Sequence, residues 1–89
     1  MNQEVDKVFS MIETMTGVTK EQLVSPTRVK NVVAARHLAM HTMREHLGMK
    51  VVDVARLFNR DHTSVTHATK CINSGRHNKL IKSLIDGQQ

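Results

Sequence analysis

The stretch NRDHTSVTHA, residues 59–68, holds residue types that catalysis, metal binding and nucleic-acid recognition all use. Asp61, His62 and Ser64 are the types of a catalytic triad. Neighbouring positions on one helix point in different directions, however, so these side chains cannot form the hydrogen-bonded line that a triad requires. A chain of 89 residues also leaves little room for a water-excluding pocket. We therefore expect no catalytic residues and no enzyme.

Histidine pairs are the second chemical option. His37 and His41 have the i, i+4 spacing that places two imidazoles on one helix face, whereas His62 and His67 are five apart and do not share a face. The sequence has no H-E-x-x-H motif, and Cys71 is its only cysteine, which also excludes an internal disulfide. We expect no metal site and no cofactor.

The charge distribution points to nucleic acid. The net charge is +5, and residues 28–89 hold eleven basic and four acidic side chains against two basic and four acidic in residues 1–27. A basic domain is the usual footprint of a nucleic-acid binder, and the lack of Trp and Tyr argues against base stacking on aromatic platforms. No apolar run approaches the ~18 residues of a membrane span. An ordinary soluble basic protein would show the same charge, so nucleic acid is one candidate partner at this point. We expect no membrane association, and the single cysteine fits a cytoplasmic setting.

The elements that must position these residues are helices. Val5, Val8, Phe9, Ile12 and Met15 recur at helical spacing, and the following glycine is a stop signal. The segment TKEQ, residues 19–22, has the pattern of a capping box that opens a short helix, which the Ser-Pro pair at 25–26 ends. The N-terminal segment thus predicts one long and one short helix.

The rest of the chain predicts three or four more helices. A long helix is expected from about Lys30 to Leu47, with Gly48 as its C-cap. Its apolar positions are Val33, Leu38, Met40, Met43 and Leu47, and its helix propensity is raised by Ala34, Ala35 and Ala39. Residues 51–58 form the next helix, and Asn59 and Arg60 form a turn. Asp61 caps a helix over 62–74 that turns Val65, Ala68 and Ile72 inward, and Asn78 caps a last helix over 78–85. We predict a compact all-α domain over residues 1–89, with about five to six helices and a helix-turn-helix at about 51–74.

A helix-turn-helix suits DNA because the major groove admits one helix and its first residues meet the base edges. Thr63 offers a methyl group to a thymine, His62 donates or accepts, and Asp61 accepts from a cytosine amino group. An ordinary amphipathic helix with a polar first turn would show the same periodicity, so this pattern alone is a weak signal.

Longer sequence motifs indicate a family more specifically than this periodicity does. RDHTSV at 60–65 resembles the R-D-H-T-T-V signature of the C-terminal DNA-binding domain of DnaA, the bacterial replication initiator. ARHLAM at 35–40, VTKEQLVS at 18–25 and VTHATKCI at 65–72 resemble further segments of the same domain, so the likeness covers about residues 4–85. The resemblance implies a Trp-repressor-like arrangement of helices that binds A·T-containing sites of the DnaA-box type as a single unit.

The resemblance also implies a role for individual residues. The run that starts at Asp61 enters the major groove, and Arg28 reaches into the minor groove, where a narrow A·T-rich groove favours arginine. The residues implied to contact bases are Arg28, Arg36, His37, Asp61, His62, Thr63 and Ser64, and those implied to contact phosphates are Lys30, Arg44, Arg60, His67 and Lys70.

Departures from the family pattern bear on site preference. Ser64 replaces the usual second threonine and so lacks one methyl group, Asn59 stands where glycine is common, and the loop SPTRVKN is less basic than the family's. We therefore expect a DnaA-box-like, A·T-containing site, for which these departures either weaken binding or shift the preferred sequence.

The chain has no G-x-x-x-x-G-K-[ST] loop, so it predicts neither nucleotide binding nor ATP hydrolysis. We expect a stand-alone, nucleoid-associated monomer of a bacterium or phage that competes with a full initiator, in replication control or transcription regulation. Three alternatives stay open: an excised domain of an initiator, a protein-interaction module that uses the first helix, and a ligand-gated repressor.

Overall fold

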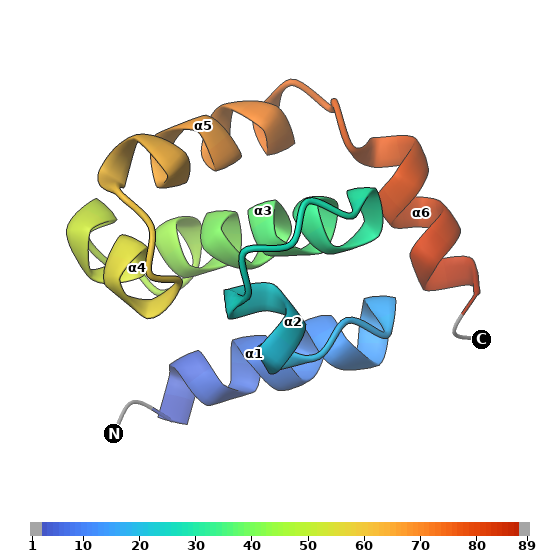
Figure 1. Ribbon diagram of the computed structural model, residues 1–89, viewed down its shortest axis with the longest axis horizontal. Coiled ribbons are helices and arrows are strands. Elements are labelled where there is room, and N and C mark those ends of the chain that lie inside the picture. The colour runs from blue at the N-terminus through green and yellow to red at the C-terminus, as the bar shows by residue number, and fades with distance from the viewer. Residues whose placement is uncertain (1–2, 88–89) are drawn as a thin grey trace.

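Six α-helices make up the regular structure of residues 3–87, the part of the chain that the computed structural model describes. No strand occurs among these residues, so the all-α prediction is confirmed. Helix α3 lies in the middle, with α5 on one side and α1 and α2 on the other (Figure 1). The helices are α1 (Gln3–Thr16), α2 (Lys20–Val24), α3 (Lys30–Glu45), α4 (Val51–Leu57), α5 (His62–Asn73) and α6 (Asn78–Asp86).

Local signals fix most helix ends where the sequence predicts them. Gly17 adopts a φ of 77° directly after α1, which a residue without a Cβ does at no steric cost. The capping box of α2 is formed in both directions, because Thr19 Oγ1 accepts from the Gln22 N–H at 3.2 Å and Gln22 Oε1 accepts from the Thr19 N–H at 2.9 Å. The chain then leaves the helix at Ser25, just before the proline.

The predicted helix-turn-helix consists of α4, a short turn and α5, and α4 packs against α5. Asn59 takes a φ of 53°, the left-handed conformation that asparagine tolerates better than most residues. Asp61 caps α5, as its position before the helix predicts. The turn and the start of α5 are therefore set by local sequence.

Two helix ends differ from prediction. Helix α3 stops at Glu45 with His46 as its C-cap, two residues before the predicted end, because the chain leaves the helix for the left-handed conformation at Gly48 (φ 65°). Asn78 is the first residue of α6 rather than its cap; His77 holds the cap position and makes no side-chain capping bond.

The buried face of α3 also differs from the predicted one. Ala34, Ala35 and Ala39 have no exposed surface and lie on the helix that α5 packs against, so they serve close packing as well as helix propensity. Of the predicted apolar positions, Met40 and Met43 are buried, whereas Val33, Leu38 and Leu47 are only partly buried. Small side chains at buried positions let neighbouring helices pack close to α3, and α5 is one of the helices that pack on it.

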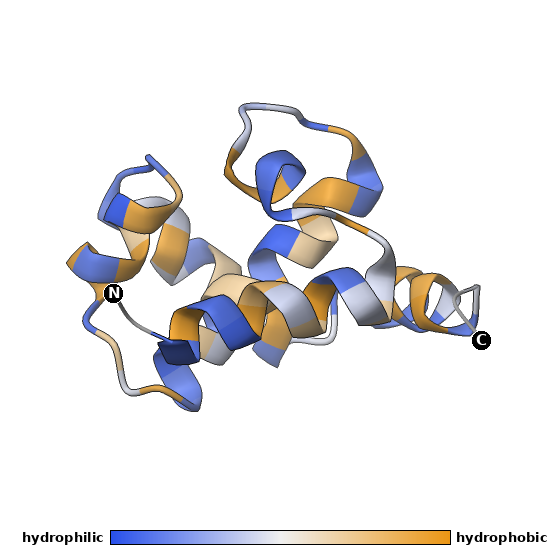
Figure 2. Cartoon of the chain, turned by 90° about the horizontal axis from the view of Figure 1, so that it is seen from below, coloured by the Kyte–Doolittle hydropathy of each residue, from blue (hydrophilic) through white to orange (hydrophobic). Residues whose placement is uncertain are grey.

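The apolar face of α1 points into the domain's own core. Val5, Val8, Phe9 and Ile12 are buried, and the ring of Phe9 lies 5.7 Å from that of Phe58, centroid to centroid. This burial removes the apolar surface that the protein-interaction alternative assigned to a partner. Helix α6, near the C-terminus in Figure 2, instead has no buried residue, although it packs on α3 and α1.

Candidate nucleic-acid interface

The first turn of α5 presents short polar side chains on the surface. His62 and Thr63 are exposed, and Ser64 is partly buried. Asp61 Oδ1 accepts hydrogen bonds from the Ser64 N–H at 3.1 Å and from the hydroxyls of Thr63 and Ser64. The Thr63 hydrogen bond, and then the Ser64 backbone bond, lower the pKa of Asp61, so its carboxylate stays charged. The start of α5 is thus a rigid, solvent-facing edge built around one capping oxygen.

Arg60, in the turn before α5, connects this edge to a distant loop. Its backbone N–H donates to Ala55 O at 2.9 Å, which closes the turn. Its guanidinium Nη2 donates to Ser25 O at 2.8 Å, in the loop that joins α2 to α3. Two segments 35 residues apart are therefore held together next to the N-terminus of α5.

Arg36 holds the same loop from the other side and is itself 5% exposed. Its Nε donates to Leu23 O at 2.7 Å, and its Nη2 donates to Ser25 O at 2.8 Å and Thr27 O at 3.1 Å, with a longer contact to Gln22 O. Burial, and secondly the nearby charge of Arg60, lower the pKa of Arg36. The predicted base contact of Arg36 is corrected here: its guanidinium faces inward and positions the loop.

The loop that Arg36 and Arg60 hold carries Arg28, which is exposed. Arg28 lines a groove of about 410 Å³ together with Lys30 of α3 and Arg76 of the turn between α5 and α6. The three cations give this groove a positive charge suited to a phosphate backbone. Sequence reasoning missed Arg76, because only the fold brings it to a loop almost fifty positions earlier.

His37, which the resemblance assigns to a base contact, lies among other histidines between the helices. Its ring is partly buried, its Nδ1 lies 2.9 Å from His77 Nε2, and its centroid lies 5.6 Å from that of His67. Burial, followed by the charges of the neighbouring His77 and His67, lowers the pKa of His37 to about 4. Its predicted base contact stays a prediction, and the structure places His37 in a side-chain cluster between helices.

The remaining predicted phosphate contacts are spread over the surface of α3 and α5. His67 and Lys70 are exposed on α5, as Lys30 is on α3. Arg44 is partly buried and donates through Nη1 to Met49 O, which ties the end of α3 to the segment before α4. The structure thus brings Arg28 and Lys30 together, keeps His67 and Lys70 on one helix, and gives Arg44 a structural hydrogen bond.

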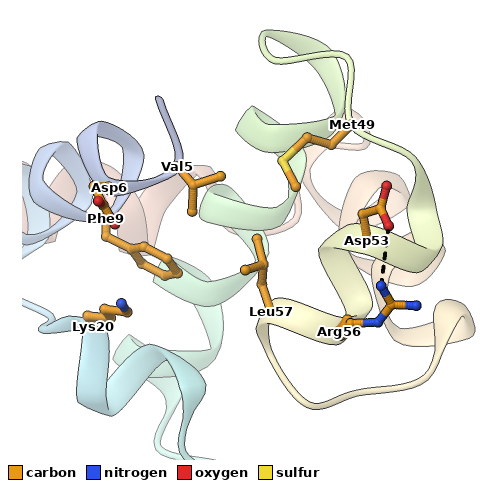
Figure 3. A pocket seen from close by; sticks show the side chains of 8 residues that line it. All are labelled: Val5, Asp6, Phe9, Lys20, Met49, Asp53, Arg56 and Leu57. Carbon is orange, nitrogen blue, oxygen red and sulfur yellow. Dashed lines mark ion pairs between the residues drawn. The ribbon is translucent and has the colours of Figure 1, made fainter. Parts of the chain in front are cut away.

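A second hollow lies between α1, α2 and α4, away from these cations (Figure 3). Its volume is about 680 Å³. Lys20 Nζ lies 5.2 Å from the centre of the Phe9 ring, and Arg56 Nη1 lies 3.8 Å from Asp53 Oδ1. Both signs of charge occur along this groove, so it does not match a uniformly negative DNA backbone. The lining residues are Val5, Asp6, Phe9, Lys20, Met49, Asp53, Arg56 and Leu57.

Two packed helices joined by a short turn, the second with an exposed polar first turn, are typical of helix-turn-helix DNA-binding domains, and the cationic loop beside them fits that class. The family model described as the bacterial dnaA protein helix-turn-helix matches residues 5–72. This chain belongs to that family. Membership supports DNA binding in the context of replication initiation. None of the helices in residues 3–87 combines the length and apolar character that crossing a membrane requires.

Curated relatives are whole replication initiators. The chromosomal replication initiator protein DnaA of Pseudothermotoga lettingae is 35% identical over 85 residues, which is 91% of this chain and 19% of the relative. That of Thermotoga petrophila is 31% identical over 84 residues, 92% of this chain and 19% of the relative. The chain therefore spans about a fifth of the length of these relatives. No solved structure matches it.

Proposed function

We propose that this chain binds double-stranded DNA sequence-specifically at A·T-containing sites of the DnaA-box type. The first turn of α5 enters the major groove, and Arg28 enters the adjacent minor groove. The observation that carries the proposal is the shared acceptor Ser25 O, to which both Arg36 and Arg60 donate at 2.8 Å. This carbonyl connects the Arg28 loop to the turn before α5, so one rigid unit presents a base-reading helix and a minor-groove arginine together.

The proposed contacts divide into two classes. Asp61, His62, Thr63 and Ser64 read base edges, since they form the exposed polar start of α5, and Arg28 reads the minor groove. Phosphate contacts position the domain without reading sequence. They are assigned to Lys30, Arg44, Arg60, His67 and Lys70, and we add Arg76 because it shares a groove with Arg28 and Lys30.

We further propose that the chain, whether a bacterium or a phage encodes it, acts as a monomer without nucleotide in the bacterial cytoplasm near the nucleoid. Occupation of DnaA-box-like sites would compete with a full initiator or regulate a nearby promoter. If the chain is instead the DNA-binding part of a longer initiator, the same surface delivers that protein to the same sites.

The test measures fluorescence anisotropy of a labelled duplex that contains a DnaA box, with a scrambled duplex of the same composition as control. We expect tighter binding to the box, and affinity that falls with salt because cation–phosphate contacts release counterions. His62→Ala should cost about 1–3 kcal/mol on the box and little on the scrambled duplex, whereas Lys70→Ala should weaken both alike. Equal affinity for the two duplexes would refute sequence-specific binding, and equal behaviour of the two variants would refute the division into contact classes.

A further inference from the structure

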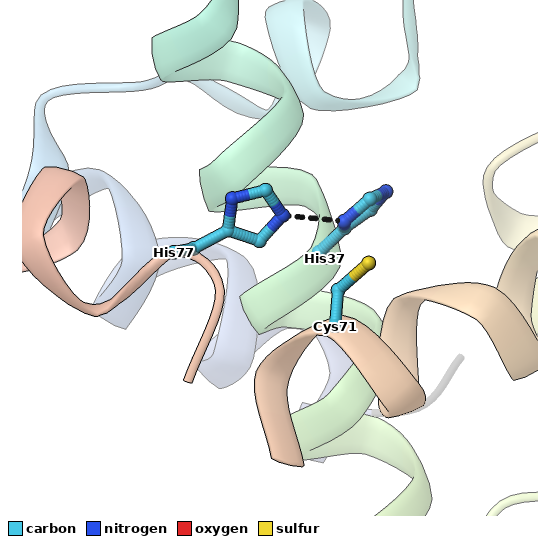
Figure 4. Close-up of side chains that lie close together, drawn as sticks. All are labelled: His37, Cys71 and His77. Carbon is cyan, nitrogen blue, oxygen red and sulfur yellow. Dashed lines mark hydrogen bonds between the residues drawn. The ribbon is translucent and has the colours of Figure 1, made fainter. Parts of the chain in front are cut away.

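Three side chains able to bind transition metals converge where α3, α5 and the turn before α6 meet (Figure 4). His37 comes from α3, Cys71 from α5 and His77 from the turn. One ligand atom of each, an imidazole nitrogen or the thiol sulfur, lies within 4.8 Å of the other two. We propose that this His–Cys–His cluster is a transition-metal site, independent of the DNA-binding proposal.

The spacing of the ligand atoms is close to that of a filled site. Zinc–nitrogen bonds of about 2.0–2.1 Å and zinc–sulfur bonds of about 2.3 Å place the ligands of a tetrahedral ion roughly 3.3–3.6 Å apart. His37 Nδ1 and His77 Nε2 are hydrogen-bonded at 2.9 Å, which is shorter than the ligand separation of a tetrahedral ion, and the separations in the cluster reach at most 4.8 Å. Metal binding would therefore break this hydrogen bond and move the turn that carries His77, which is only partly buried.

The ligand types select the class of metal. A thiolate and two imidazoles suit Zn²⁺ and neighbouring ions such as Co²⁺, whereas Mg²⁺ and Ca²⁺ require oxygen ligands, which the His–Cys–His cluster does not provide. Burial of Cys71 keeps its sulfur on the inner side of α5, facing the two rings. We therefore assign the site to zinc or a similar divalent ion rather than to a hard cation.

His67 lies beside the cluster but is not part of it. It precedes Cys71 by four positions, so both side chains lie on one face of α5, and its Nε2 is 3.4 Å from Cys71 Sγ. Its ring lies edge-on to His37, with centroids 5.6 Å apart, but the ligand atoms that lie within 4.8 Å of one another come from His37, Cys71 and His77. Three protein ligands would leave the fourth tetrahedral position to water.

One neighbouring charge opposes a bound cation. Arg76 Nη1 is 4.0 Å from Cys71 Sγ, and its positive charge would repel a cation bound there. Arg76 is exposed, so its side chain can swing into solvent when an ion arrives. A bound metal would tie α5 and the turn before α6 to α3, which matters because α6 has no buried residue of its own.

The experiment uses the full chain without an affinity tag, stripped with a chelator and titrated first with Co²⁺ and then with Zn²⁺. We expect one ion per chain, the thiolate-to-cobalt charge-transfer band and strong d–d bands of tetrahedral Co²⁺, and displacement of Co²⁺ by Zn²⁺. Cys71→Ser should abolish the charge-transfer band. His77→Gln should weaken binding by at least about 10–100-fold, the loss that even indirect contacts to a metal can cause.

His46→Ala is the matched control, since this exposed histidine of the α3 C-cap lies outside the cluster, and it should bind metal unchanged. Circular dichroism checks that each variant folds. If Cys71→Ser does not fold, His77→Gln decides the question, because His77 is only partly buried. Absence of saturable binding, absence of the charge-transfer band, or equal binding by His77→Gln and the unaltered chain would each overturn the proposal.

Discussion

Replacement of Arg36 by methionine should destabilise the domain, because it removes the donor that holds the loop between α2 and α3. Methionine keeps most of the apolar volume but leaves the carbonyls of Leu23, Ser25 and Thr27 without their bonds from this guanidinium. A hydrogen bond to a charged group contributes about 1.5–3 kcal/mol, and an unsatisfied buried acceptor costs about 1–3 kcal/mol. Of these hydrogen bonds, only the one to Leu23 O is buried, so its loss dominates the cost.

The other hydrogen bonds of Arg36 are partly buried, so water can replace them, and the loss of each should cost about 0.5–1 kcal/mol. The variant also avoids the cost of burying a charged guanidinium, which offsets part of the lost stability. We therefore expect a net loss of about 2–4 kcal/mol in the free energy of unfolding. For a domain of this size each kcal/mol shifts Tm by about 4–8 °C, so Tm should fall by roughly 10–30 °C.

Urea unfolding followed by the helical circular dichroism signal measures this loss, with an unchanged m-value as the check on two-state behaviour. Arg56→Met is the matched control, because the Arg56 side chain is 81% exposed and pairs with Asp53 only at 3.8 Å. Its cost should stay within about 0.5 kcal/mol. A loss below about 1 kcal/mol for Arg36→Met, or equal losses for the two variants, would refute the role given to Arg36.

Three further substitutions test other positions by the same unfolding assay. Asp61→Ala should cost about 0.5–2 kcal/mol through loss of the α5 cap, and Asp61→Asn should cost less because it keeps an acceptor. Asn59→Val should cost about 1–2 kcal/mol and Asn59→Gly little, since φ is 53° there; equal costs would contradict this reasoning. Ala39→Leu should cost about 1–3 kcal/mol by overpacking, and a stabilised variant would show that Ala39 does not limit the helix packing.

The features that sequence predicts well are those that neighbouring residues determine. The capping box of α2 needs only Thr19 and Gln22, three positions apart, and the cap of α5 needs only Asp61 and the backbone of Ser64. Asn59 at the turn follows the same logic, since its own conformational tolerance allows the left-handed φ. Each of these caps and turns forms between residues at most a few positions apart, so they can be predicted without knowing the tertiary structure.

The features that sequence did not predict depend on packing between distant segments. The alanines of α3 give the same helix-propensity signal whether they face solvent or α5, so their burial follows only from the assembled fold. The His–Cys–His cluster is similar, because His37 and His77 are 40 positions apart and no spacing rule joins them. Helical spacing instead pairs His37 with His41, four positions along the same helix, and gives no sign of His77.

The position of Arg36 in a local motif and its contacts with a distant loop lead to different predictions for its role. Its place in a family-like motif suggested a direct role at DNA, yet its guanidinium is enclosed by carbonyl groups of the loop that carries Arg28. If the proposed DNA surface is correct, a buried arginine in this position would affect recognition by fixing where Arg28 and the turn before α5 lie, and Arg60 would share that task through its bond to Ser25 O. Substitution of Arg36 would therefore lower DNA affinity together with stability, whereas substitution of the exposed Arg28 would lower affinity alone. Both variants would bind DNA more weakly, so affinity alone does not distinguish them. The change in DNA affinity relative to the change in folding stability separates a positioning residue from one that touches DNA.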